Sequence, residues 1–111
     1  MIAVSTRVLF GDIKPYFAPA DLDMLQGPRD GVIVLPHSVL WAPGGGEVDL
    51  DVPGGTNLAY QALLNEAPLD VQIRLLNRDR LVEWWPRLRL PVRVRDLWES
   101  RFPVLAGRRA A

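Results

Sequence analysis

Proline and glycine interrupt this chain so often that it cannot form long regular elements. Ten prolines and nine glycines are spread over 111 residues, and proline removes a backbone hydrogen-bond donor while glycine favours turns. The sequence therefore predicts short, sharply bounded helices and strands within a single compact domain of residues 1–105. Residues 106–111 carry no apolar pattern, so we expect them to form a flexible C-terminal tail.

The N-terminal half carries the patterns of β-strands. Residues 2–10 mix β-branched and apolar types, and residues 31–41 begin with GVIVL, the kind of apolar run that is buried on both faces of a sheet. In residues 47–52, acidic and apolar side chains alternate, as in a half-buried strand. The glycine-rich residues 42–46 join the last two strands into a hairpin. We therefore expect a small antiparallel sheet.

The second half carries helical spacing. Thr56 or Asn57 is expected to cap the first helix, Asp70 the second and Asp79 the third. Residues 87–95 alternate arginine with apolar residues, which fits either an edge strand or an extended segment over 87–90 followed by a helix. We prefer the latter, because a helical apolar stripe follows and runs up to Pro103, which should end the helix. The stripe consists of Val94, Leu97, Trp98 and Phe102. The predicted fold class is α+β, with the small antiparallel sheet followed by three or four short helices.

The sequence holds no recognisable catalytic motif. The absence of cysteine excludes disulfides, thiolate metal sites and a cysteine nucleophile. The only histidine, His37, precedes Ser38, and neighbours in an extended chain point to opposite faces, so the two cannot act as base and nucleophile. The glycine tracts lack the residues of a phosphate-binding loop. We therefore expect neither an enzyme nor a bound cofactor.

Three carboxylates are the best candidates for a metal site. Glu47, Asp49 and Asp51 alternate along one predicted strand, so they share a face at a spacing of about 6 to 7 Å. They would need a fourth ligand from elsewhere. A solvated or arginine-paired acidic face is the favoured interpretation, and we expect no metal.

Charge is distributed unevenly, although the formal net charge is zero. Residues 1–70 hold three cations and nine acidic residues, whereas residues 71–111 hold ten arginines and four acidic residues. Arginine makes bidentate contacts with carboxylates and phosphates. The basic half is therefore expected to bind carboxylates of the chain's own acidic half or of a partner, with nucleic-acid phosphates as the alternative.

Adjacent tryptophans beside the arginines mark the candidate binding surface. Neighbours on a helix point about 100° apart. Trp85 is in phase with Leu81 and Leu88, and Trp84 is out of phase, so Trp84 either packs on a second element or contacts a partner. The predicted partner-binding residues are Trp84, Arg87, Arg89, Arg93 and Arg95.

The segment LLNRDRLVEWWPRLRLPVRVRDLWESRFPVL, with VDLDVPGGTNLAYQALLNEA and VIVLPHSVLW upstream, resembles a family of small actinobacterial proteins. In that family a Trp-Pro-x-Leu-x-Leu-Pro segment leads into a Val-Arg-x-x-Trp-Glu helix. The resemblance covers roughly residues 31–105. It implies an antitoxin-like or regulatory partner of nucleotidyltransferase-type toxins and transfers no functional residue. Trp84 stands where an aliphatic residue is expected, and residues 53–55 are richer in glycine.

We thus expect a small non-enzymatic interaction or regulatory protein that binds the acidic surface of another protein. The alternative is a nucleic-acid-binding transcriptional regulator that places the same arginines on phosphates. No apolar stretch approaches the about 18 residues of a membrane span, and the N-terminus lacks a signal-peptide pattern, so we expect a cytoplasmic protein. Homo-oligomerisation stays open.

Overall fold

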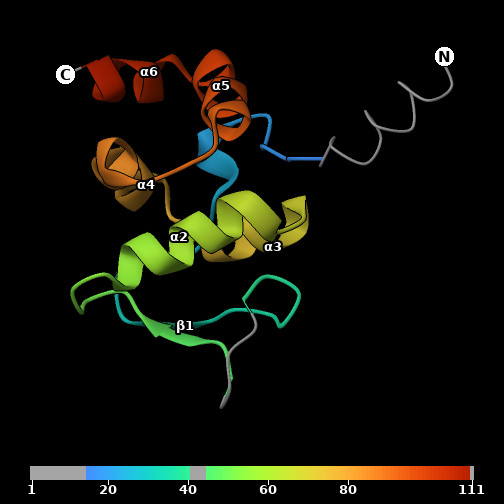
Figure 1. Ribbon diagram of the computed structural model, residues 1–111, viewed down its shortest axis with the longest axis vertical. Coiled ribbons are helices and arrows are strands. Elements are labelled where there is room, and N and C mark those ends of the chain that lie inside the picture. Colours follow the sequence, from blue (N-terminus) through green and yellow to red (C-terminus); the bar gives the residue numbers. More distant parts are fainter. Residues whose placement is uncertain (1–14, 41–44, 111) are drawn as a thin grey trace, which may run out of the picture.

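A computed structural model describes residues 15–40 and 45–110, with side chains described as far as Gly107 (Figure 1). The strand predicted for residues 2–10 lies outside this range. In chain order the elements are η1 (Leu22–Met24), β1 (Val32–Val34), β2 (Glu47–Asp49), α2 (Gly55–Glu66), α3 (Leu69–Leu75), α4 (Arg78–Trp84), η2 (Trp85–Arg87), α5 (Val92–Arg101) and α6 (Pro103–Ala110). A short antiparallel sheet is followed by helices, which confirms the α+β fold class.

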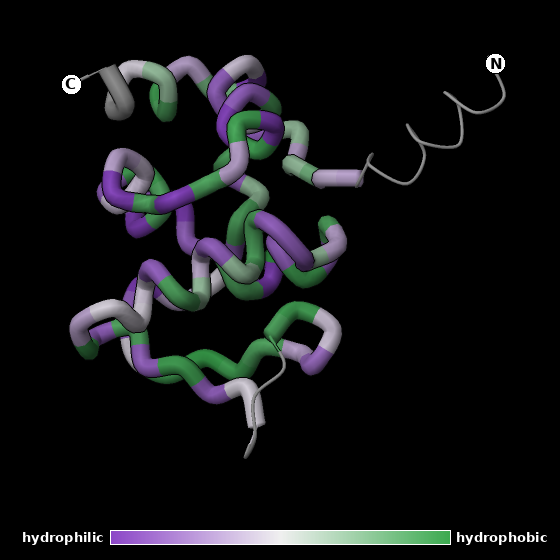
Figure 2. Tube along the Cα trace, in the orientation of Figure 1, coloured by the Kyte–Doolittle hydropathy of each residue, from purple (hydrophilic) through white to green (hydrophobic). Residues whose placement is uncertain are grey.

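The hairpin forms as predicted, but it is covered on one face only. β1 and β2 are antiparallel, with Val32 opposite Asp49 and Val34 opposite Glu47. Ile33 is buried, whereas Val32 and Val34 are 57% and 61% exposed. The prediction that this strand is buried on both faces was therefore wrong, because α2 packs against the sheet from one side and no described residue covers the other. Figure 2 shows the hydrophobic strand at the edge of the molecule.

The helices begin at residues other than the predicted caps. Gly54, with φ 82°, precedes α2, and the Thr56 hydroxyl donates to the Leu50 carbonyl at 3.0 Å instead of capping the helix. Pro68 precedes α3, so Asp70 lies in its first turn. The side chain of Asn77 caps α4 by accepting from the Arg80 amide at 2.9 Å. Thr56, Asp70 and Asp79 are thus inside their helices.

The C-terminal region settles the ambiguity of residues 87–95. Arg87 closes η2 instead of beginning the predicted extended segment, and residues 88–90 form neither helix nor strand. α5 begins at Val92 directly after Pro91, so the edge-strand alternative was wrong. Pro103 does end α5, but it also opens α6, which continues to Ala110. Proline is favoured in the first helical turn, where its missing N–H has no intrahelical partner. Leu105 on α6 is completely buried.

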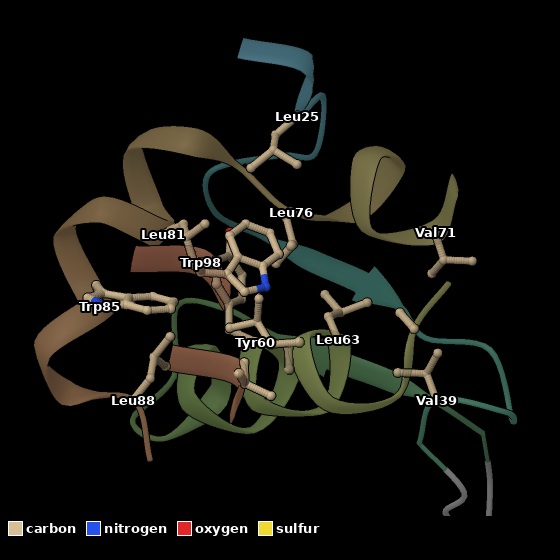
Figure 3. Packing of buried hydrophobic residues seen from close by; sticks show 14 of the residues in the cluster. Leu25, Val39, Tyr60, Leu63, Val71, Leu76, Leu81, Trp85, Leu88 and Trp98 are labelled. Carbon is tan, nitrogen blue, oxygen red and sulfur yellow. The ribbon is translucent and has the colours of Figure 1, made fainter. Parts of the chain in front are cut away.

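Aromatic side chains form the centre of the core (Figure 3). Trp85, Trp98 and Tyr60 are each 0% exposed. The ring centroids of Trp85 and Trp98 lie 6.4 Å apart, and those of Trp98 and Phe102 lie 5.5 Å apart, within the range of favourable aromatic pairs. The Tyr60 hydroxyl on α2 accepts a hydrogen bond from the Asn77 amide at 3.0 Å. This bond connects α2 to the junction between α3 and α4.

Candidate interaction surface

The two adjacent tryptophans have different environments. Trp85 is fully buried, and the preceding Trp84, at the end of α4, is half-buried. Leu81 and Leu88 are buried with Trp85, as the helical phase predicts. The structure therefore leaves Trp84 accessible at the point where the chain passes from α4 to η2.

The Trp84 ring is held by two arginines. The Arg80 and Arg87 guanidinium carbons lie 5.7 and 4.9 Å from its centroid, both within cation–π range. Arg80 is itself fixed, since its guanidinium donates to the Leu50 carbonyl at 2.6 Å and to the Thr56 hydroxyl at 3.2 Å. Arg80 was missed by the sequence interpretation, although its i,i+4 spacing from Trp84 on a helix is a usable signal.

Arg87 and Arg89 extend from the surface on either side of a buried residue. Leu88 between them is 1% exposed, and both arginines are exposed. The backbone amide of Arg89 donates to the Gln61 side chain of α2 at 2.7 Å, which fixes the segment. Within the described part of the chain, neither guanidinium forms an ion pair. These two cations are therefore available to an external anion.

Arg93 lies on a different element, in the first turn of α5. It is exposed, and its guanidinium carbon lies 4.9 Å from the ring centroid of Tyr16. This contact joins α5 to the start of the described chain. We call Trp84, Arg87 and Arg89 the Arg/Trp surface.

Arg95 points into the protein and does not belong to this surface. Its side chain is 16% exposed, and it lies 3.8 Å from the Glu99 carboxylate and 5.3 Å from the Trp85 ring centroid. It also donates to the Leu88 carbonyl. The Trp85 indole N–H donates to the same Glu99 carboxylate at 2.8 Å. The structure therefore separates Arg95 from the other predicted partner-binding arginines. Arg93 and Arg95 are two residues apart on a helix, so their side chains differ by about 200° in direction.

The three carboxylates of the candidate metal site do not share a face. Asp51 lies beyond the end of β2, where its carboxylate accepts from the Gly31 amide at 3.1 Å. Asp49 accepts from the Asp51 amide at 2.9 Å. Glu47 is exposed. Among the described residues no three acidic or histidine side chains gather as metal ligands would. Hydrogen bonds from backbone amides therefore already use the carboxylates of Asp49 and Asp51.

A shallow groove of about 450 Å³ lies between α4 and α6. Its lining residues are Arg78, Asp79, Val82, Glu83 and Val104. Glu83 pairs with Arg29 at 3.1 Å, and Arg78 pairs with Asp23 at 3.0 Å. These ion pairs connect the first and second halves of the chain, and the lining offers no nucleophile with a neighbouring base.

Comparison of the chain with known proteins found no relative. No family model, no curated protein and no solved structure matches this chain. In the region that the structure describes, no helix has the length and apolar character needed to cross a bilayer.

Proposed function

We propose that this chain is a small non-enzymatic interaction protein that binds the acidic surface of a partner protein through the Arg/Trp surface. The observation that carries the proposal is the pairing of Trp84 with Arg87 and Arg89. An accessible aromatic ring lies beside two exposed cations that have no carboxylate among the described residues. Tryptophan and arginine are the residue types that dominate binding hot spots.

The surface is arranged for docking rather than for chemistry. Trp84 is already ordered by Arg80 and Arg87, so little side-chain entropy is lost when a partner covers the ring. Arg87 and Arg89 supply charge complementarity, which accelerates encounter and fixes orientation. An antitoxin-like or regulatory role follows from the family resemblance described above, and it remains part of the proposal.

A nucleic-acid-binding regulator is the second candidate. Arg87, Arg89 and Arg93 are all exposed, and arginine side chains also suit phosphates. The inward position of Arg95 removes one of the predicted contacts. This alternative requires binding that weakens steeply with salt and is lost after nuclease treatment.

The test is a pull-down of the tagged full-length chain from its native lysate, with and without nuclease. We expect a stoichiometric protein partner that survives nuclease. Trp84→Ala and Arg87→Glu should each lower its retention about tenfold, a typical hot-spot effect, while a thermal melt shows that the domain stays folded.

The matched control is Arg74→Glu, which makes the same charge change on the exposed face of α3. It should retain the partner at the wild-type level. Equal losses from Arg74→Glu and Arg87→Glu would show that only net charge matters. Disappearance of every retained protein on nuclease treatment would favour the nucleic-acid alternative.

A further inference from the structure

We propose that this chain binds a second copy of itself. The Arg/Trp surface of one copy docks onto the uncovered side of the β-hairpin of the other copy. The inference rests on the proposed function, because it uses the same surface and the same acidic chemistry. The docking face on the second copy consists of Val32, Val34, Glu47 and Asp49, which we call the valine–carboxylate face.

The hairpin places apolar and acidic side chains next to each other on its open side. The register sets exposed Val32 beside Asp49 and exposed Val34 beside Glu47. Directly opposed residues of an antiparallel pair point to the same face of the sheet. Each apolar side chain therefore has a carboxylate neighbour, and the face offers a partner both apolar area and negative charge.

The Arg/Trp surface offers the complementary pattern. Arg87 and Arg89 are two residues apart across an extended Leu88, whose φ and ψ are −76° and 137°. Glu47 and Asp49 are likewise two residues apart on a strand. Both spacings correspond to about 6.6 Å along an extended chain. Two arginine–carboxylate pairs can therefore form in parallel, with the Trp84 ring available to cover a valine.

Among the described residues no ion pair joins the two surfaces within one molecule, although Arg80 beside Trp84 reaches the Leu50 carbonyl just after β2. α2 lies between the hairpin and the helices α4 and α5 (Figure 1). β2 packs on α2, and the segment carrying Arg89 contacts α2 through Gln61. The contact between copies is therefore heterologous, head to tail. The opposite net charges of the two halves of the chain favour this arrangement of like molecules.

The first measurement is sedimentation equilibrium of the full-length chain at low and high salt. At low salt the average mass should rise above that of one chain between about 10 μM and 1 mM, the range of weak contacts. At about 0.5 M salt it should return towards one chain, since the contacts are largely ionic. A chain that stays monomeric at low salt throughout this range overturns the inference.

A pair of variants tests the two faces separately. Variant A carries Glu47→Lys and Asp49→Lys, and variant B carries Arg87→Glu and Arg89→Glu. Each alone has one damaged face and should be monomeric. Mixed, the intact Arg/Trp surface of A meets the intact valine–carboxylate face of B, so a one-to-one dimer and no larger species should form.

Trp84→Ala distinguishes this contact from simple attraction between oppositely charged variants. Added to A, it should weaken the mixed dimer about tenfold. Added to B, whose Arg/Trp surface is not used, it should have no effect, although the net charges are the same. Equal effects in A and B, or self-association of A or B alone, overturn the inference.

The outcomes separate this inference from the proposed function. A wild-type chain that is monomeric here, but loses a lysate partner through Trp84→Ala and Arg87→Glu, refutes self-docking and supports the proposed function. A mixed dimer with the asymmetric Trp84 effect supports self-docking, whether or not another protein is retained from the lysate.

Discussion

At the scale of single residues, helical phase decides which of two like neighbours is free to bind. Trp84 and Trp85 were separable from the sequence because Leu81 and Leu88 fix the phase of their turn. Arg95 was not. The alternation of arginine with apolar residues continues across Pro91, but the backbone changes to a helix at Val92. Arg95 was grouped with Arg87, Arg89 and Arg93 because all four lie close to the tryptophans in the sequence, although the helical phase of α5 turns it inward.

Gly27 allows two backbone segments to approach closely. Its amide donates to the Leu76 carbonyl at 2.8 Å, and a Cβ at this position would lie 2.2 Å from the Leu75 carbonyl oxygen. Gly27→Ala should therefore lower the free energy of unfolding by about 3 kcal/mol, because the clash is with backbone that has little room to move. Urea denaturation measures the change.

Gly107 on α6 provides the control for that substitution. No non-neighbouring atom of the described residues lies within 4 Å of its Cβ position. Gly107→Ala should raise stability by about 0.5 to 1 kcal/mol, the difference in helix propensity. If both alanine variants were equally stable, the close approach at Gly27 would have no energetic consequence.

At the scale of elements, local patterns gave the hairpin and the helical phases, but not every boundary. Asn77 and Asp79 are both residue types that commonly cap helices, and they lie two positions apart. In the structure the side chain of Asn77, not that of Asp79, caps α4. The GVIVL run was predicted to be covered on both faces, yet α2 covers only one. Which face receives a cover depends on how distant elements pack, and that is not encoded in a short window.

Asn77 has two roles at the start of α4. Its side-chain oxygen accepts from the Arg80 amide at 2.9 Å, and its side-chain nitrogen donates to the Gly27 carbonyl at 3.0 Å. Asn77→Ala should cost about 1 to 2 kcal/mol, the usual cost of losing an N-cap. Asp79→Ala removes an exposed carboxylate and its exposed ion pair with Arg78, and should cost less than about 0.5 kcal/mol. Chemical denaturation of both variants tests the assignment, which a reversed order would contradict.

At the scale of the whole molecule, only some of the described acidic side chains of the first half form ion pairs with arginines of the second half. Arg78 pairs with Asp23, and Arg29 pairs with Glu83, so internal pairing accounts for some of the predicted asymmetry. These pairs are exposed and contribute little stability individually. The fold depends instead on the buried aromatic centre, and Arg87 and Arg89 keep their charge available at the surface.

The central tyrosine makes global stability depend on alkaline pH. Burial raises the pKa of Tyr60 from 10.0 to about 12, opposed by the Asn77 hydrogen bond and the nearby arginines. Above pH 10 the unfolded tyrosine ionises while the folded one stays neutral. Unfolding then releases a proton, so stability should fall between about pH 10 and pH 12, by about 2 to 3 kcal/mol in all.

Tyr60→Phe isolates this contribution. At neutral pH this substitution should lower the free energy of unfolding by about 1 to 2 kcal/mol, because the backbone N–H of Asn77 loses its acceptor. Between pH 10 and pH 12 the variant should lose less stability than the wild type, and the gap between the two should close. Urea unfolding from pH 8 to pH 12 measures both curves. Parallel curves would show that Tyr60 does not titrate between the folded and unfolded states.

The contrast between accessible Trp84 and buried Trp85 and Trp98 gives the molecule two separate optical reporters. Among the described tryptophans, an aqueous quencher such as iodide reaches Trp84, and a partner that covers this ring shields its fluorescence. The tilted Trp85–Trp98 pair instead contributes near-ultraviolet circular dichroism, which is lost only when tertiary packing is lost. For these three tryptophans, iodide quenching therefore follows docking at Trp84, and circular dichroism follows the packing of the Trp85–Trp98 pair.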